Sequence, residues 1–424
     1  MKRYEDLLKS CGVEQYIITD ETEESVELFF IKKKLDMRRI KSNEKISVTI
    51  YKTINEGANK FIGESDFTGD PSMTDEEWIA KIKAALYSAE FVHNKYYELP
   101  KGEKSDLVVA ESDLMNYSLE EAANLFVKAV YEEDINPLSF INSFELFAVN
   151  RTVTIKGTNQ SDVSYQKREI NGEFVVQCKE PTDVETYQDF RFDTLNISEM
   201  KELVSRTISM TIDRAKATKM PKSGVTDVVL SHKYMSELMN FYKDRASVAS
   251  IYPGYYENKL NENIQGDDVK GDVLNMKFSP VEPFSGHGIR MIERDFIKDG
   301  VLMTLHGSAR FSYYLNVPAI GYYGKVVLPS GDVAFEDLLK RKCLHIVNFS
   351  DFQMDSDTGH FKGEIRLAYC YNEDGSRTIV TGGSINGSIF EAQKEFIFSK
   401  ECQNLPYYSG PKAVLLKNVP VAGE

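Results

Sequence analysis

The sequence predicts an α+β protein in which helices and strands are segregated along the chain rather than strictly alternating. Runs of β-branched and aromatic residues between turn sequences indicate antiparallel strands. Several helices begin at recognisable capping boxes, and beyond residue 225 short strands and glycine predominate. We therefore expect an N-terminal mixed α/β part with antiparallel hairpins and capped helices, followed by a C-terminal, mainly antiparallel β domain.

The length of the chain indicates more than one hydrophobic core. It has 424 residues, of which 42% are hydrophobic, and single cores stop growing at roughly 250–300 residues. Proline and glycine interrupt the helical pattern at residues 220–224, so we place the domain boundary there. The predicted domains are residues 1–220, divisible into subdomains 1–105 and 106–220, and residues 225–424.

Hairpins are expected near the start of the chain, with a turn at Ser42-Asn43. The predicted strands are residues 25–32, 35–41 and 45–53. Basic residues crowd segment 32–41, but acidic residues precede them in segment 21–27. We interpret this charge pattern as a solvated sheet face and not as an anion site.

Three helices are predicted from caps and periodicity. Each begins with a polar cap residue that is followed three positions later by glutamate. The cap pairs are Thr74 with Glu77, Ser118 with Glu121, and Asn196 with Glu199. Behind each cap, apolar residues recur at the spacing of a buried helix face.

Between the second and third helices, the pattern predicts a long antiparallel stretch. Asn171-Gly172 is the strongest hairpin turn signal in the chain. The expected strands are residues 144–156, 163–170, 174–178 and 184–192.

Composition excludes several classes of function. The net charge is −14, whereas a nucleic-acid binder normally presents a basic face. No run of about 18 apolar residues and no signal-peptide pattern is present, so we expect a cytoplasmic protein without membrane spans. The five cysteines are scattered and odd in number, which argues against a disulfide framework.

The residues between 355 and 396 carry the most specific signal. Thr358-Gly359-His360-Phe361, a glycine-bearing strand and Ser384-Ile385-Asn386-Gly387 follow one another in order. This arrangement resembles the C-terminal signature of the TldD/PmbA family, whose members are known as modulators of DNA gyrase and regarded as metallopeptidases. Further segments similar to the family's elements are residues 183–187, 215–221, 292–310 and 411–423.

In the catalytic branch of this family, as the resemblance implies, a HExxxH helix holds zinc with two histidines, and its glutamate activates the bound water. The helix follows a strand equivalent to residues 228–230 here. The register then places Asn240, Phe241 and Arg245 at the histidine, glutamate and histidine positions. Because an arginine cation opposes a dication and phenylalanine cannot act as a base, we expect this chain to bind no zinc or other cofactor.

Other candidate ligands are weaker. Cys343 and His345 are two residues apart and would face the same side of a strand, but no second pair of ligands is visible. The catalytic branch also supplies a cysteine near its C-terminus, and Cys402 lies in that neighbourhood without a histidine pair to join. Asp355 opens a sequence that imitates a calcium loop, but Arg366 stands where a bidentate glutamate is required.

The resemblance implies the TldE/PmbA-like branch, which lacks the metal motif. Its implied role is a partner subunit in a dimer, with a zinc-bearing TldD-like paralogue or with a second copy of itself. Such an assembly cleaves unfolded or extended peptides, including microcin-type precursors, and strand edges of the C-terminal domain would pair with the peptide backbone. Possible peptide contacts are Gly382, Gly383, Gly387, Tyr313, Tyr314, Tyr322 and Tyr323.

Alternatives remain open for these residues and for the whole chain. The glycines also fit strand bulges, and the tyrosines, expected on adjacent strands, also fit simple packing. The chain could be a stand-alone metallopeptidase with atypical ligands, or a non-enzymatic peptide-binding homodimer.

Overall fold

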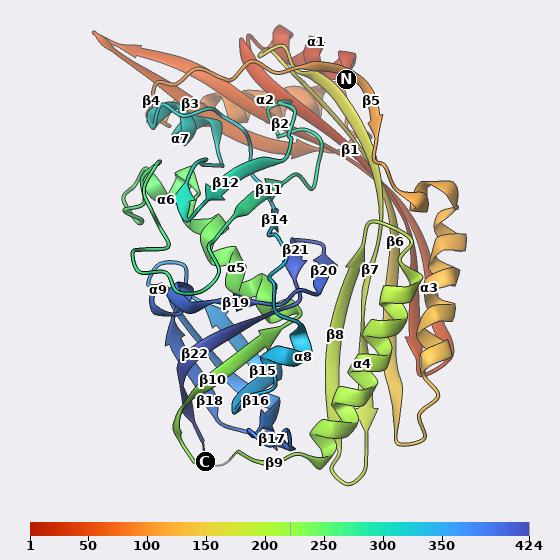
Figure 1. Ribbon diagram of the computed structural model, residues 1–424. Coiled ribbons are helices and arrows are strands. Elements are labelled where there is room, and N and C mark those ends of the chain that lie inside the picture. Colours follow the sequence, from red (N-terminus) through yellow and green to blue (C-terminus); the bar gives the residue numbers. More distant parts are fainter. Residues whose placement is uncertain (221, 424) are drawn as a thin grey trace.

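The computed structural model of this protein describes residues 1–220 and 222–423. Pro221, in the predicted boundary segment, and Glu424, at the end of the predicted second domain, lie outside the described residues. Within them the strands form three sheets, one from residues 15–192 and two from residues 218–422 (Figure 1). Helices and strands are segregated and the sheets are mainly antiparallel, which confirms the predicted α+β class.

The first sheet has the order β4-β3-β2-β1-β6-β7-β5, and β8 pairs with the remaining length of β7. Its strands are β1 (Gln15–Ile31), β2 (Lys34–Glu56), β3 (Asn59–Gly69), β4 (Asn94–Lys95), β5 (Lys104–Val109), β6 (Ser139–Gly157), β7 (Asp162–Cys178) and β8 (Val184–Phe192). Figure 1 shows these long strands curving over the top and down one side of the C-terminal part.

Two predicted turns are wrong because long strands run through them. Ser42-Asn43 lies inside β2, where it pairs with residues 23 and 24 of β1. Asn171-Gly172 lies inside β7, between β6 and β8. A Cβ atom on Gly172 would stand 2.0 Å from the carbonyl oxygen of Glu145, so this glycine permits close approach of two strands and does not form a turn.

The predicted caps are confirmed. Thr74 and Ser118 form complete capping boxes, and the side chain of Asn196 accepts a hydrogen bond from the backbone N–H of Glu199. The helices of this part are α1 (Lys2–Ser10), α2 (Asp75–Ala89), η1 (Asp113–Asn116), α3 (Leu119–Glu133) and α4 (Ile197–Lys216). The helices α3 and α4 bury Phe126 and Val204 against the first sheet.

The second sheet has the order β15-β10-β22-β18-β16-β17-β9, with β19 on β22. Its strands are β9 (Thr218–Lys219), β10 (Gly224–Ser231), β15 (Cys343–Met354), β16 (His360–Tyr371), β17 (Arg377–Thr381), β18 (Ser384–Ser388), β19 (Ile397–Phe398) and β22 (Ala413–Ala422). The calcium-like sequence is a turn, since the Asp355 carboxylate accepts hydrogen bonds from the backbone of Asp357 and the hydroxyl of Thr358.

The third sheet has the order β13-β12-β11-β14-β21-β20. Its strands are β11 (Met276–Ser279), β12 (Arg294–Lys298), β13 (Val301–Leu302), β14 (Lys325–Val327), β20 (Cys402–Leu405) and β21 (Tyr408–Pro411). The remaining helices are α5 (Lys233–Arg245), α6 (Val248–Ile251), α7 (Ala309–Tyr314), α8 (Phe335–Leu338), α9 (Ile389–Ala392) and η2 (Gln393–Glu395).

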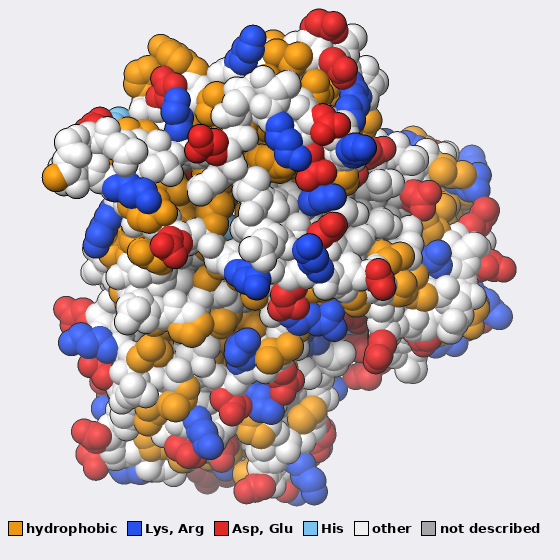
Figure 2. Space-filling view, turned by 90° about the horizontal axis from the view of Figure 1, so that it is seen from above, with side chains coloured by type: hydrophobic (Ala, Val, Ile, Leu, Met, Phe, Trp, Pro, Cys, Tyr) orange, Lys and Arg blue, Asp and Glu red, His pale blue; other side chains and the backbone are white. Residues whose placement is uncertain are grey.

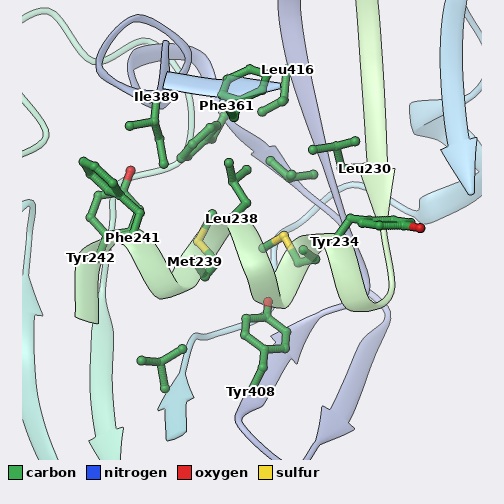
Figure 3. Packing of buried hydrophobic residues seen from close by; sticks show 14 of the residues in the cluster. Leu230, Tyr234, Leu238, Met239, Phe241, Tyr242, Phe361, Ile389, Tyr408 and Leu416 are labelled. Carbon is green, nitrogen blue, oxygen red and sulfur yellow. The ribbon is translucent and has the colours of Figure 1, made fainter. Parts of the chain in front are cut away.

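The helix α5 crosses the largest core of the protein (Figure 3). Leu238 and Met239 are fully buried, and Tyr234 and Phe241 are nearly so. They pack with side chains of the second and third sheets, including Phe361, Leu416 and Tyr408. The position of α5 is therefore fixed from several sides.

The surface mixes charges of both signs. On the face drawn in Figure 2, Lys and Arg side chains are interspersed with Asp and Glu. None of the helices that the structure describes combines the length and apolar character needed to cross a bilayer.

Candidate functional site

A cleft of about 1220 Å³ lies between the first sheet and the C-terminal part of the chain. One wall is formed by residues 169–173 of β7 and 188–192 of β8, and α4 extends it with Glu202 and Arg206. The opposite wall is the N-terminal half of α5, together with His345 of β15 and residues 402–407. The cleft therefore collects side chains from segments far apart in the sequence.

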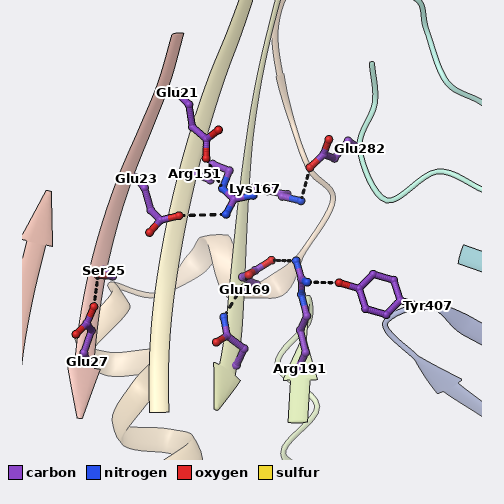
Figure 4. Close-up of polar contacts among 11 residues, drawn as sticks. Glu21, Glu23, Ser25, Glu27, Arg151, Lys167, Glu169, Arg191, Glu282 and Tyr407 are labelled. Carbon is purple, nitrogen blue, oxygen red and sulfur yellow. Dashed lines mark hydrogen bonds and ion pairs between the residues drawn. The ribbon is translucent and has the colours of Figure 1, made fainter. Parts of the chain in front are cut away.

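The inner face of the first sheet is unusually polar for a sheet face that lies against other structure (Figure 4). Arg151 pairs with Glu21 and Glu23. Arg191 of β8 pairs with Glu169 of β7 and donates a hydrogen bond to the Tyr407 hydroxyl, in the segment between β20 and β21. This contact links the two walls of the cleft.

One border of the cleft is an unpaired strand edge. Among the described residues, β8 pairs only with β7, and residues 188–192 of β8 line the cleft. In an antiparallel edge strand, alternate residues direct their N–H and C=O groups away from the neighbouring strand. The geometry allows an extended chain in the cleft to pair with this edge.

The α5 wall carries a half-buried carboxyl group, that of Glu237. Lys233, Glu237 and Asn240 are spaced three or four residues apart on α5 and line the cleft, as expected for one helix face. Burial raises the pKa of Glu237 to about 7, although Lys233 acts in the opposite direction. A carboxyl group with this pKa is partly protonated near neutral pH.

The structure brings two of the three metal-motif positions together, Phe241 and Arg245, and separates Asn240 from them. Asn240 lines the large cleft, and its buried Oδ1 has no hydrogen-bond partner among the described residues. Phe241 is buried in the core and, like Arg245, lines a second cavity of about 900 Å³. The Arg245 guanidinium lies 5.4 Å from the ring centroid of Phe241. An amide, a phenyl ring and a guanidinium do not provide the neutral imidazole, thiolate or carboxylate donors that zinc requires.

Arg245 is held by neighbouring rings and carbonyl oxygens. Its guanidinium lies 4.4 Å from the ring centroid of Tyr256 and 5.4 Å from that of Phe390. It donates hydrogen bonds to the carbonyl oxygen of Ser356 and to Oδ1 of Asn258. Burial lowers the pKa of Arg245, and these contacts compensate for that burial.

Of the weaker ligand candidates, His345 and Cys402 both line the cleft, whereas Cys343 does not. His345 lines the cleft, and burial lowers its pKa to about 3. Cys402 is exposed at the cleft, and burial raises the pKa of its thiol, which disfavours the thiolate. Cys343 packs in a separate small core with Val229 and Leu338. Across residues 1–220 and 222–423, no group of three His, Cys, Asp or Glu is placed to hold a metal ion.

The predicted peptide contacts lie elsewhere. Gly382 and Gly383 have positive φ in the turn between β17 and β18. Gly387 lies in β18, where a Cβ atom would stand 2.4 Å from the ring of Phe361. None of the seven proposed contact residues, all within the described part of the chain, lines the large cleft.

The expectation that the tyrosines stand on adjacent strands is wrong. Tyr313 and Tyr314 are the last residues of α7. Tyr323 is buried and donates a hydrogen bond to the carbonyl oxygen of Ile292, while Tyr322 is exposed. The short helix begins after Ser308, whose side chain accepts a hydrogen bond from the backbone N–H of Phe311. This cap was not recognised in the sequence because the neighbouring segments have the pattern of strands.

Sequence reasoning missed Arg206, Glu237 and the open edge of β8. Residues 199, 202 and 206 recur at helical spacing on α4, which marks a polar stripe beside its apolar face. That stripe is an ordinary feature of a solvated helix. Only the tertiary arrangement shows that it faces a cleft.

Comparison with known proteins agrees with the fold. The family described as "PmbA/TldA metallopeptidase C-terminal domain" matches residues 223–423. No curated protein matches the chain significantly.

Three solved structures share the whole fold. A candidate modulator of a DNA gyrase from Thermotoga maritima MSB8 superposes with a TM-score of 0.80 at 16% identity, covering 99% of this chain and 100% of that chain. TldE from Thermococcus kodakarensis gives 0.79 at 13% identity, with 99% and 100% covered. A candidate modulator of DNA gyrase from Bacteroides thetaiotaomicron VPI-5482 gives 0.78 at 15% identity, with 100% and 98% covered. Residues 223–423 therefore match the C-terminal domain of the PmbA/TldD family, and the whole chain shares the fold of these three structures.

Proposed function

We propose that this chain is the TldE/PmbA-like, non-metal-binding subunit of a peptidase that acts on unfolded or extended peptides. The observation that carries the proposal is the open edge of β8 along the 1220 Å³ cleft. Backbone pairing with an edge strand recognises an extended peptide without requiring a fixed sequence. A folded protein cannot offer such a strand unless one of its own edges is free.

The chemistry of the chain's own residues supports a binding role rather than hydrolysis. At the positions of the family's zinc motif stand Asn240, Phe241 and Arg245, and Arg245 is already engaged by Tyr256 and Phe390. In this proposal the zinc and its activated water belong to a TldD-like paralogue. This chain binds and orients the peptide backbone.

The proposal includes a dimer in the cytoplasm. In a heterodimer with a zinc-bearing paralogue, peptide binding by this chain and hydrolysis by the paralogue belong to one assembly. Such an assembly would act in the maturation of precursor peptides. A homodimer of this chain would bind peptides without cleaving them. The proposal includes no nucleic acid, since a chain of net charge −14 repels phosphate backbones.

The experiment compares the purified chain, the purified paralogue and their mixture in hydrolysis of an unfolded, fluorescently labelled protein such as casein. We expect no cleavage and no stoichiometric zinc for the chain alone, and chelator-sensitive cleavage for the mixture. Stoichiometric zinc with chelator-sensitive cleavage by the chain alone would overturn the proposal. Cleavage by the paralogue that the chain does not increase would also overturn it.

A further inference from the structure

Arg206 is an unpartnered guanidinium in the wall of the cleft. It lies on α4 and is half-buried. No hydrogen bond or ion pair joins it to any residue in the described part of the chain. A guanidinium carries five N–H donors in a planar fork, so a half-buried arginine normally has a carboxylate, a carbonyl group or a ring as its partner. Arg206 has its donors free.

The neighbouring carboxylates are engaged elsewhere. Burial lowers the pKa of Arg206, while the charges of Glu202 and Glu199 act in the opposite direction. Glu202 pairs with Lys412 at 3.2 Å. Glu199 accepts a hydrogen bond from the Asn196 side chain at the helix cap. Neither carboxylate is within ion-pair distance of Arg206, so a further acceptor can approach its fork from the cleft.

A second unsatisfied group belongs to the same corner of the cleft. Burial, and then the charges of Arg206 and Lys412, lower the pKa of His232 well below its ordinary value. Its Nδ1 atom lies 3.0 Å from the Ser231 hydroxyl, whereas its buried Nε2 atom has no hydrogen-bond partner among the described residues. The backbone of His232 has a φ of 57°, which costs energy for a residue with a Cβ atom.

We infer that Arg206 forms a carboxylate subsite, which receives the free α-carboxylate of a bound peptide. The inference rests on the proposed function, because it assigns a polarity to the peptide in that cleft. A planar carboxylate matches the guanidinium fork with two parallel hydrogen bonds.

A terminal carboxylate suits the cleft better than acidic side chains along the peptide. Asp189 and Glu237 also line the cleft, and neither forms an ion pair with a described residue. The charge of Asp189, and that of Glu237 in its ionised form, repel acidic side chains placed along the rest of the peptide. A peptide whose single negative group is at its C-terminus avoids this repulsion and reaches Arg206.

The test uses three short, unstructured, fluorescein-labelled peptides of one alanine-, serine- and threonine-based sequence. The first ends in a free carboxylate, the second in an amide, and the third in an amide with one internal glutamate. Binding to the intact chain is measured by fluorescence anisotropy. We expect the free acid to bind about 10- to 100-fold more tightly than the amide, the range expected for charged hydrogen bonds.

The variant Arg206→Gln should bind all three peptides with the affinity of the wild type for the amide. Because Arg206 has no partner within the chain, this variant should keep the melting temperature of the wild type. Arg206→Lys should retain part of the preference as a point charge. The control Arg38→Gln, at an exposed pair with Glu120, should leave the preference unchanged.

The outcomes separate the inference from the proposed function. Equal affinity of the wild type for acid and amide, or a preference that persists in Arg206→Gln, overturns the carboxylate subsite but leaves peptide binding intact. Equal affinity for the internal glutamate and the free acid overturns the assignment to the C-terminus. If no peptide binds the wild type, both the subsite and the peptide-binding role fail.

Discussion

The Nε2 atom of His345 lies 2.9 Å from the Oγ atom of Ser231, and this contact joins β15 to the end of β10 beside the cleft. Both side chains are buried. The same hydroxyl lies 3.0 Å from Nδ1 of His232. One serine therefore connects two imidazoles whose pKa values are lowered by burial, to about 3 for His345.

We expect the protein to lose stability as the pH falls from about 6.5 toward 3. In the unfolded chain, His345 takes up a proton near pH 6.5, whereas in the folded chain its pKa is about 3. The contribution of His345 to the stability of the folded form is therefore fully present above pH 6.5. Below that pH, each such histidine lowers the free energy of unfolding by about 1.4 kcal/mol per pH unit. Urea unfolding at several pH values measures how steeply the free energy of unfolding falls with pH. The variant His345→Gln should show a shallower dependence on pH, and an unchanged dependence would contradict this explanation.

Gly172→Ala should destabilise the protein by about 2 kcal/mol or more, because a Cβ atom there meets a backbone carbonyl oxygen at 2.0 Å. The matched control is Gly224→Ala in β10, where nothing lies within 4 Å of the added carbon. The control should change the unfolding free energy by no more than about 0.5 kcal/mol. Equal effects of the two substitutions in chemical denaturation would show that β7 tolerates a side chain at this point.

Arg245→Leu should cost about 2–3 kcal/mol of unfolding free energy, since it removes charged hydrogen bonds to Ser356 and Asn258 and the contacts with aromatic rings. Arg245→Lys should recover only part of this loss, because an ammonium cannot reproduce the planar fork. The exposed Lys259→Ala serves as control and should be nearly neutral. A neutral effect of Arg245→Leu in urea unfolding would mean that the guanidinium contributes no net stability.

Glu27→Gln should destabilise the first sheet by about 2 kcal/mol at pH 7, because its buried carboxylate pairs with Lys41 at 2.6 Å and Arg39 at 2.7 Å. Burial acts to raise the pKa of Glu27, but these partners hold it below its ordinary value. The stabilisation is therefore present above about pH 4.5 and is lost as the pH falls below it.

The loss caused by Glu27→Gln should shrink when denaturation is repeated at pH 3. Glu120→Gln, at the exposed pair with Arg38, should change stability by no more than about 0.5 kcal/mol. An effect of Glu27→Gln that does not depend on pH would show that the charge of Glu27 is not what matters.

Local signals in the sequence predicted the helices well. The capping boxes at Thr74 and Ser118 depend on residues three positions apart, so they can be recognised without knowing the rest of the fold. Turn signals failed where strands are long. Ser42-Asn43 and Asn171-Gly172 have turn chemistry, but pairing with neighbouring strands along their whole length holds them extended.

The candidate site was predictable only in part. The order of strand and helix around residues 228–245 located α5. The assignment of altered metal positions to this helix stays a prediction from the resemblance. The cleft itself is assembled from α4, β8, α5 and β15, which are brought together by contacts between distant segments. In the sequence, Arg206 and Glu237 look like ordinary surface charges. Only the folded structure shows that both are partly buried and line the same cleft.

The place of β22 in the second sheet bears on how the protein is made. This strand, residues 413–422, lies between β10 and β18, so a segment far from β10 in the sequence occupies the middle of the sheet. We expect β10 to remain without this neighbouring strand until residues 413–422 have been synthesised, whereas the first sheet, built from residues 15–192, can form earlier. Deletion of residues 413–422 would therefore remove an interior strand of the second sheet, with neighbours on both sides.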